Sequence, residues 1–222
     1  IYAFEKSNHI EFDERQRAAI EIAVNQGLLI LTGGPGTGKT TTVRGIIALM
    51  KNKGLNVALA APTGRAAKRM TELTGCEAKT IHRLLEVEYK DGANEPSFVY
   101  NRKNKLDVDA VIIDELSMVD IKLFDSFLEA LPMSARLIMV GDKDQLPPVG
   151  AGNVLKDLTE SGMIPVVQLE KIFRQAMESL IVTNAHQVVK GNMPDLSHND
   201  IHSDFFLLKE HSPYNASKKI VD

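Results

Sequence analysis

Residues 28 to 40 read Leu-Leu-Ile-Leu-Thr-Gly-Gly-Pro-Gly-Thr-Gly-Lys-Thr, a short apolar run followed by a glycine-rich turn that ends in a lysine and a threonine. The turn, residues 33–40, has the spacing G-x-x-x-x-G-K-[ST]. A loop that is short of side chains lets successive backbone N–H groups surround a polyphosphate, while the lysine and the hydroxyl complete the site. We therefore expect a nucleoside triphosphate to bind here, with Lys39 on its β- and γ-phosphates and the Thr40 hydroxyl on Mg²⁺.

The segments on both sides of this loop fit the same interpretation. The apolar run at 28–31 is typical of a strand that is buried inside a parallel sheet. After the loop, apolar residues recur at helical spacing up to Met50, and Gly54 ends the predicted helix. Such a helix would point its positive end at a bound anion. The alternative, a glycine-rich turn that matches the motif by chance, is disfavoured because strand, loop and helix occur in the required order.

Strands and helices alternate along most of the chain. Further apolar runs predict strands, and capped or amphipathic stretches predict helices between them. This alternation implies an α/β fold with a mostly parallel sheet that helices cover on both faces. The predicted strands are 28–31, 56–60, 110–113, 136–140 and 165–169, and the predicted helices are 13–26, 41–50, 64–73, 120–131 and 179–189.

The interval 86–104 interrupts this alternation. It holds two short β-prone pieces around a polar turn that is rich in Gly, Asn and Pro. Two interpretations stay open for it, a small β-hairpin inserted into the domain and a surface loop.

Two adjacent carboxylates, Asp114 and Glu115, follow the third predicted strand directly. Parallel sheets present their functional loops at the carboxyl ends of the strands. In a nucleotide-hydrolysing site the first carboxylate would hold the Mg²⁺ that Thr40 also contacts, and the second would orient or deprotonate the attacking water. An acidic pair after a strand can also be only a helix cap, an interpretation that the complete phosphate loop disfavours.

The loop 141–150 follows the fourth predicted strand and carries Gln145. Two prolines and two glycines fix the loop backbone, and the Gln145 amide can both accept and donate a hydrogen bond near a γ-phosphate. An ordinary proline-rich connector is equally compatible with these residues.

A basic helix face is the candidate contact for a polyanion. Arg65, Lys68 and Arg69 lie at i, i+3 and i+4 and therefore share one face of the helix 64–73. Thr63 precedes that helix, where free N–H groups can also bind phosphate. Because basic faces are more often only solvated, the pattern by itself leaves the question undecided.

Bulk properties limit the class of protein. The 222 residues are 44% hydrophobic and have a formal charge of −3, so any nucleic-acid contact must be local. The single cysteine, Cys76, excludes an internal disulfide and a multi-cysteine metal site, which fits a reducing cytoplasm. No apolar run is long enough to span a membrane. His198 and His202 lie in a polar stretch that we interpret as a loop rather than a metal site.

In this order, the segments resemble the motif series of the RecD-like DNA helicases of superfamily 1. Gln16 resembles the adenine-reading glutamine of that family. The first motif alone is shared by very many nucleotide hydrolases, whereas the ordered series from Gln16 to Gln175 is specific. The matching segments are 33–41 for motif I, 61–70 for motif Ia, 80–85 for the next DNA-contacting motif, 114–118 for motif II, 141–152 for motif III and 169–175 for motif IV.

This resemblance implies that residues 1–192 form the first of two RecA-like motor domains of an ATP- and Mg²⁺-dependent helicase that moves 5′ to 3′ on single-stranded DNA. The implied catalytic residues are Lys39, Glu115, Gln145 and Arg174, and the implied metal ligands are Thr40 and Asp114. The implied nucleotide-binding residues are Gln16, Gly33, Gly34, Pro35, Gly36, Thr37, Gly38, Lys39, Thr40 and Thr41. The implied DNA-binding residues are Thr63, Gly64, Arg65, Lys68 and His82.

The resemblance leaves open the role of the hairpin, the extent of the parent protein and its assembly. The predicted hairpin occupies the place where related enzymes carry a pin that splits the duplex. Because no motifs of a second motor domain follow Gln175, we expect residues 193–222 to lead toward a missing domain, and the chain alone to bind nucleotide weakly and to unwind nothing. The parent could be a monomeric stand-alone motor or the RecD-like subunit of a helicase–nuclease complex. A non-enzymatic nucleotide switch and an RNA motor are the alternative functions.

Overall fold

The computed structural model describes residues 1–88, 97–197, 203–207, 209, 210 and 212. The chain divides into two compact units, Ile1–Lys171 and Ile172–Asp222. The predicted boundary of the motor domain at residue 192 stays a prediction, and His198 and His202 lie outside the described residues.

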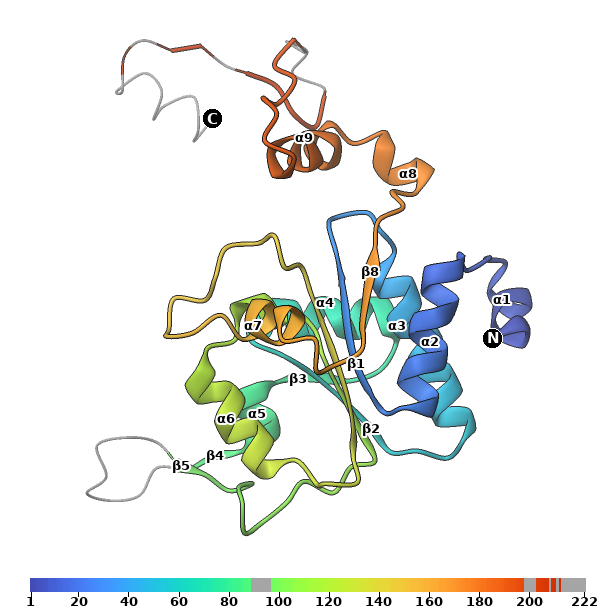
Figure 1. Ribbon diagram of the computed structural model, residues 1–222, viewed down its shortest axis with the longest axis vertical. Helices are drawn as coiled ribbons and strands as arrows, with labels where there is room; N and C mark the ends of the chain where they lie inside the picture. The colour runs from blue at the N-terminus through green and yellow to red at the C-terminus, as the bar shows by residue number, and fades with distance from the viewer. Residues whose placement is uncertain (89–96, 198–202, 208, 211, 213–222) are drawn as a thin grey trace. The chain divides into compact units, whose positions relative to one another are not determined.

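A parallel six-stranded sheet forms the centre of the first unit, with the order β3-β2-β6-β7-β1-β8 (Figure 1). The five predicted strands are all present, and the three inner strands β6, β7 and β1 are almost completely buried, as expected for parallel strands covered on both faces. The sixth, β3, is a short edge strand that the sequence analysis missed because its three residues, Ala-Lys-Thr, form no apolar run. The strands are β1 Leu28–Gly33, β2 Val57–Ala61, β3 Ala78–Thr80, β6 Ala110–Ile113, β7 Arg136–Gly141 and β8 Val166–Leu169.

Helices cover both faces of this sheet, as predicted. Successive residues of a strand point to opposite faces, so Leu29 and Leu31 join the core under α2, α3 and α4, while Ile30 joins the core under α5, α6 and α7. Figure 1 shows α2 and α3 on one side of β1 and α6 on the other. The helices are α1 Tyr2–Asn8, α2 Glu14–Asn25, α3 Lys39–Asn52, α4 Gly64–Thr74, α5 Ile81–Leu85, the 3₁₀ helix η1 Leu116–Met118, α6 Ile121–Ala130 and α7 Val154–Glu160.

The strand register determines which loops meet. β1 lies between β7 and β8, with Thr32 opposite Gly141 and Gly33 opposite Leu169. β6 lies between β2 and β7, with Ile113 opposite both Ala60 and Met139. The chain therefore leaves β1, β6 and β7 at the same edge of the sheet, the place where parallel sheets bind their ligands.

The predicted hairpin is present as a small antiparallel sheet. β4 (Val87–Glu88) pairs with β5 (Ser97–Phe98), and Tyr100 N–H donates to the Leu85 carbonyl at 3.1 Å, next to the pair. The turn between the two strands lies outside the described residues.

The second unit contains α8 (Arg174–Met177) and α9 (Leu180–Val189), the latter predicted with Ser179 as its N-cap. The Ser179 hydroxyl donates to the Asp204 carboxylate at 2.5 Å, and the carboxylate also accepts from Leu180 N–H at 2.9 Å. These bonds satisfy the exposed donors at the start of α9.

A candidate nucleotide-binding site

The glycine-rich loop joins β1 to α3 in the conformation that its sequence requires. Gly36 and Gly38 have φ values of +74° and +85°, in the left-handed region that favours glycine. The Thr37 hydroxyl donates to the Gly34 carbonyl at 2.8 Å and so closes the loop on itself. The Lys39 ammonium donates to the carbonyls of Gly33 and Gly34, the latter at 3.0 Å. The loop thus keeps the ammonium at its mouth, at the N-terminus of a 14-residue helix.

Asp114 and Glu115 follow β6 at the same edge of the sheet. The Asp114 backbone N–H donates to the Ala60 carbonyl at 2.9 Å, which extends the pairing of β6 with β2 by one residue. Glu115 has a φ of +54°, a conformation that is costly for a residue with a side chain and that often occurs at functional sites. Although Glu115 is the N-cap of η1, its side chain makes no capping bond. A purely structural capping role for this carboxylate is therefore not supported.

A third carboxylate, Asp142, belongs to the same group and was missed by the sequence analysis. It follows β7 directly and is only 6% exposed. Its Oδ1 accepts the Asp144 N–H at 3.1 Å, and its charge acts on Lys39. The signal was present in the sequence, because Asp142 stands after an apolar strand in the same way as Asp114 does.

Burial and mutual charge shift the pKa values of these groups. Burial lowers the pKa of the Lys39 ammonium, although Asp142, Asp114 and Glu115 pull it upward. Burial raises the pKa of Asp114, with partial compensation from the Glu115 N–H and from Lys39. The Glu115 pKa is raised by burial first and by the Asp114 charge second. Ionisable groups of opposite charge that are partly buried together are typical of sites that bind phosphates and transfer protons.

One further cation, Arg69, acts on this group. Its charge lowers the pKa of Asp114, Glu115 and Lys39, so it stands within electrostatic range of all three. Helical spacing had placed Arg69 with Arg65 and Lys68 on the basic face of α4 alone. The Arg69 charge thus also acts on the candidate nucleotide site.

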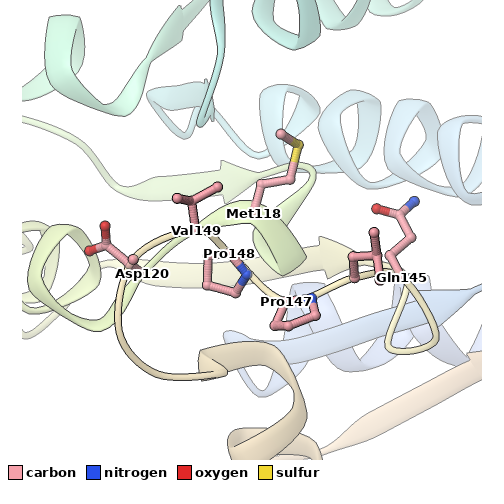
Figure 2. A pocket seen from close by; sticks show the side chains of 8 residues that line it. Met118, Asp120, Gln145, Pro147, Pro148 and Val149 are labelled. Carbon is pink, nitrogen blue, oxygen red and sulfur yellow. The ribbon is translucent and has the colours of Figure 1, made fainter.

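Gln145 is exposed on the loop that follows β7, and its Oε1 accepts a hydrogen bond from the Ser117 hydroxyl at 3.0 Å. This bond connects the loop to η1, the segment immediately after Glu115. The loop borders a pocket of about 510 Å³ whose other walls are Met118 and Asp120 (Figure 2). Leu146 and Val149 of the same loop are strongly exposed. One hydrogen bond therefore joins the segment that follows the acidic pair to an exposed loop.

Gln16, the predicted adenine reader, lies at the start of α2 and is 1% exposed. It forms a capping box with Asp13, in which each side chain accepts the other residue's backbone N–H, at 2.8 and 3.0 Å. Its Nε2 donates to the carbonyl of Gly38 at 3.4 Å. The structure thus places Gln16 against the glycine-rich loop.

The predicted DNA-contacting residues occupy the start of α4 and of α5. The Thr63 hydroxyl accepts the Ala66 N–H at 3.2 Å as the N-cap of α4, while Gly64, Arg65 and Lys68 are exposed. His82 is exposed in the first turn of α5, with its ring 6.0 Å from that of Phe98 in the hairpin. Their contact with DNA stays a prediction.

Arg174 begins α8 in the second unit. Its predicted approach to a γ-phosphate stays a prediction, because its side chain is not among the described features.

The donor set suits Mg²⁺. Among the described residues no three His, Cys, Asp or Glu side chains gather into a metal cluster. Mg²⁺ does not require one, since it is usually bound by one or two carboxylates together with substrate phosphates and water. The hydroxyl of Thr40 and the carboxylate of Asp114 are hard oxygen donors of this kind.

These features define an α/β domain with a glycine-rich loop and three carboxylates, Asp114, Glu115 and Asp142, at one edge of its sheet. The sequence matches the family model described as an AAA domain over residues 16–151, more than half of the chain. The chain therefore belongs to this family. The described part of the chain contains no helix that is long and apolar enough to cross a membrane.

Two curated relatives agree with the family resemblance. The chain is 39% identical over 193 residues to the ATP-dependent RecD2 DNA helicase of Deinococcus radiodurans, covering 87% of this chain and 26% of that protein. It is 43% identical to the RecBCD enzyme subunit RecD of Mycolicibacterium smegmatis, covering 66% of this chain and 30% of that protein. The resemblance to the RecD-like helicases of superfamily 1 is confirmed. The chain spans less than a third of the length of these two relatives.

Solved structures confirm the RecA-like fold. The Pif1 helicase of Candida albicans superposes with a TM-score of 0.60 at 25% identity, over 84% of this chain and 46% of that one. The Bacteroides Pif1 helicase in complex with ADP-AlF3 and ssDNA gives a TM-score of 0.56 at 21% identity, over 95% of this chain and 56% of that one. At that identity the second likeness concerns the fold alone.

Proposed function

We propose that this chain binds and hydrolyses ATP with Mg²⁺ as the first motor domain of a DNA helicase that moves 5′ to 3′ on single-stranded DNA. The observation that carries the proposal is the convergence of Lys39, Asp114, Glu115 and Asp142 at the carboxyl edge of three adjacent strands. The curated relatives, one named as an ATP-dependent DNA helicase, support the choice of reaction.

The residues of the site suit the steps of hydrolysis. The loop N–H groups and Lys39 would bind the β- and γ-phosphates, and the ammonium would leave its carbonyl partners to do so. Thr40 and Asp114 would hold Mg²⁺, which supplies charge neutralisation on the phosphate oxygens. As the water oxygen bonds to the γ-phosphorus, Glu115 would take a proton from the water, the bond from the γ-phosphorus to the bridging oxygen would break, and ADP and inorganic phosphate would leave. The raised pKa of Glu115 makes it a better proton acceptor than an exposed carboxylate.

Two features next to the site, a loop and a basic helix face, would connect ATP hydrolysis to DNA. The Ser117–Gln145 bond connects the segment after Glu115 to the loop 141–150. The basic face of α4, with Arg65 and Lys68 exposed, would contact phosphates of the strand. We also propose that the motor is monomeric and cytoplasmic. We propose that it can associate with other helicase–nuclease subunits, because several relatives are named as RecBCD subunits.

The decisive experiment measures ATP hydrolysis by the purified parent protein, with both motor domains, in the presence and absence of single-stranded DNA. Lys39→Ala should abolish the DNA-stimulated rate, whereas Lys53→Ala, which removes an exposed lysine beyond the same helix, should leave it unchanged. A native rate in Lys39→Ala would refute the assignment of the site. Comparing DNA with RNA of the same sequence distinguishes a DNA motor from an RNA motor, because the 2′-hydroxyl is the local chemical difference along the backbone.

A further inference from the structure

A second pocket lies at the edge of the sheet where β1 and β7 begin. It has a volume of about 570 Å³ and is lined by residues 25–28, Leu128 and residues 131–137, from the ends of α2 and α6 and the starts of both strands. Because β1 has six residues and rises about 3.3 Å per residue, its two ends lie roughly 16 Å apart. This amino-edge pocket is therefore separate from the glycine-rich loop, which follows the other end of β1 (Figure 1).

Arg136 is the only charged residue that lines the amino-edge pocket. Among the residues that the structure describes, its Nε is the single buried side-chain nitrogen or oxygen without a hydrogen-bond partner. In the same described ranges no carboxylate forms an ion pair with its guanidinium. A buried donor without an acceptor destabilises a fold, so its presence calls for an explanation other than stability.

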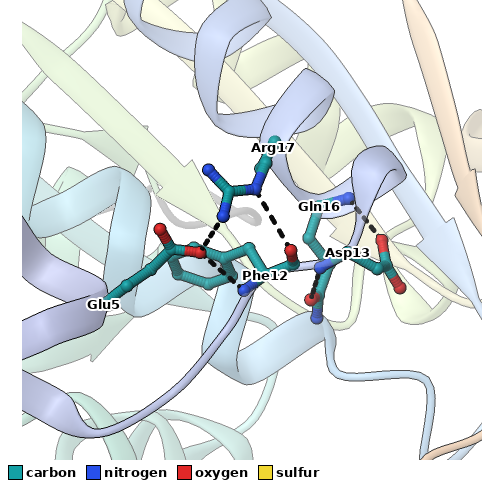
Figure 3. A network of polar contacts seen from close by, with 5 residues as sticks. All are labelled: Glu5, Phe12, Asp13, Gln16 and Arg17. Atoms are coloured by element: carbon teal, nitrogen blue, oxygen red, sulfur yellow. Dashed lines mark hydrogen bonds and ion pairs between the residues drawn. The ribbon is translucent and has the colours of Figure 1, made fainter. Parts of the chain in front are cut away.

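Arg17 on α2 shows how this chain pairs a guanidinium that has a structural role. Its Nε donates to the Phe12 carbonyl at 3.2 Å, and a second guanidinium N–H donates to the Glu5 carboxylate at 2.6 Å (Figure 3). These bonds hold α1 and the chain before α2 to the first turn of α2, whose last residue lines the amino-edge pocket. The described part of the chain provides no bonds of this kind for the buried Nε of Arg136.

The end of α6 does not require the charge of Arg136. A helix C-terminus carries partial negative charge and free carbonyls, which a cation can offset. In α6 the Lys105 ammonium already donates to the Glu129 carbonyl at 2.6 Å. The next carbonyl, that of Ala130, accepts the Leu106 N–H at 2.9 Å. Stabilisation of this helix end therefore does not explain the guanidinium in the pocket.

The mouth of the amino-edge pocket is apolar. Met133 is 99% exposed and Leu128 is 43% exposed. Gly27 has a φ of +76°, and an added Cβ there would lie 3.0 Å from Arg136 Cγ, so the bare backbone lets the arginine stem pack closely. Arginine and methionine among apolar side chains are typical of protein–protein interfaces, whereas nucleic-acid surfaces carry several cations that follow the phosphates.

We propose that the amino-edge pocket docks a segment of a partner protein that presents an acidic side chain next to an apolar one. The carboxylate would accept from Arg136 Nε–H and a neighbouring N–H of the guanidinium, while the apolar side chain would cover Leu128 and Met133. Charge complementarity determines this occupant, because the lining contains one cation and no anion. The inference goes beyond ATP hydrolysis and does not depend on it.

The test selects binders from a random peptide library displayed on phage, with the purified parent protein as the target and excess single-stranded DNA present. The retained peptides should be enriched in Asp or Glu next to Leu, Ile, Phe or Met. One of them, made with a fluorescent label, should bind about tenfold more tightly than its form with the acidic residue changed to the amide, because hydrogen bonds between charged groups are the stronger ones. Fluorescence anisotropy measures both affinities.

Two variants locate the binding. Arg136→Met retains an apolar stem of similar length and should remove the preference for the acid over the amide, whereas Lys53→Met, which removes an exposed cation after α3, should retain it. Met133→Glu changes an exposed side chain, so the fold should be unaffected. Its carboxylate at the pocket mouth should weaken the acidic peptide roughly tenfold by like-charge repulsion. Tyr2→Glu adds the same charge at an exposed position of α1 and is the matched control.

Several results would overturn the inference. These are a selection without enrichment of acidic and apolar pairs, an unchanged preference for the acid in Arg136→Met, and displacement of the peptide by single-stranded DNA. The melting temperature of Arg136→Met without peptide gives an independent measurement. It should equal or exceed the native value, because the variant removes an unpartnered buried donor. A clearly lower value would show that the guanidinium serves the fold and would also overturn the inference.

Discussion

Replacing Glu115 with glutamine tests whether the site is catalytic. The side chain of Glu115 makes no capping bond to η1, and glutamine has the same shape, so the strained φ of +54° and the fold should be retained. The amide cannot accept a proton from water. If Glu115 is the general base, hydrolysis should therefore fail after ATP has bound.

The expected loss of rate in Glu115→Gln follows from the role of Glu115 as a general base. A positioned general base contributes roughly 10²- to 10⁴-fold to the rate, equivalent to about 2.7–5.4 kcal/mol of activation free energy. ATP binding should be unchanged or tighter in Glu115→Gln, because one negative charge leaves a group that also contains Asp114 and Asp142. The variant should consequently lower the catalytic rate without raising the dissociation constant for ATP.

The assay measures single-turnover hydrolysis of ATP in the presence of single-stranded DNA, together with ATP affinity by equilibrium titration. Glu129→Gln, an exposed position on α6, is the control for the loss of one carboxylate. A rate in Glu115→Gln within about twofold of the native rate, well short of the effect expected for a general base, would refute the reasoning. Such a result, with nucleotide binding retained, would favour the non-enzymatic switch.

Three further predictions concern pH and stability. Because burial raises the Glu115 pKa above 4.5, the acidic limb of a kcat/KM–pH profile should lie above that value, and a limb at or below it would contradict the assignment. Burial also raises the Asp114 pKa, so its ionised form destabilises the fold. Asp114→Asn should therefore increase the free energy of unfolding at pH 7, and this gain should shrink as pH falls below the folded pKa and vanish below the ordinary value of 3.8. Urea titrations at pH 7 and at a pH below 3.8 measure this gain in the free energy of unfolding. A gain that persists at the acidic pH would exclude desolvation of the carboxylate as its cause. Phe127→Ala should lower the unfolding free energy by about 3–5 kcal/mol, because a fully buried ring is removed from the core under α6, and a loss below about 1 kcal/mol would show that the core refills the space.

The sheet could be predicted because most of its strands can be recognised from their own residues. Buried parallel strands are apolar on both faces, so β1, β6 and β7 appear as continuous apolar runs without reference to their neighbours. β3 lacks that signal, since its pairing with β2 depends on the preceding helix returning the chain to the sheet edge. α1 has seven residues and one buried side chain, Glu5, so no apolar periodicity marks it.

The site likewise has residues that short segments predict and residues that only the packing of the whole fold brings together. Lys39 and Asp114 could be predicted because motif spacing and strand ends are properties of short segments. The contact of Glu5 with Phe12 and Arg17 joins three elements through one buried carboxylate, and no spacing rule connects those positions. Such contacts are set by how the helices pack, a property of the whole fold.

Arg69 shows where a local rule gives an incomplete answer. Helical spacing correctly places it beside Arg65 and Lys68, and its side chain is exposed. Spacing does not reveal that long helical side chains lean toward the N-terminus of their helix. In α4 that end follows β2, whose residue Ala60 accepts the backbone N–H of Asp114, so the lean brings the guanidinium toward the acidic pair. The charge of Arg69 consequently acts on Asp114 and Glu115 from the helix that carries the basic face, and the two surfaces of the domain share one residue.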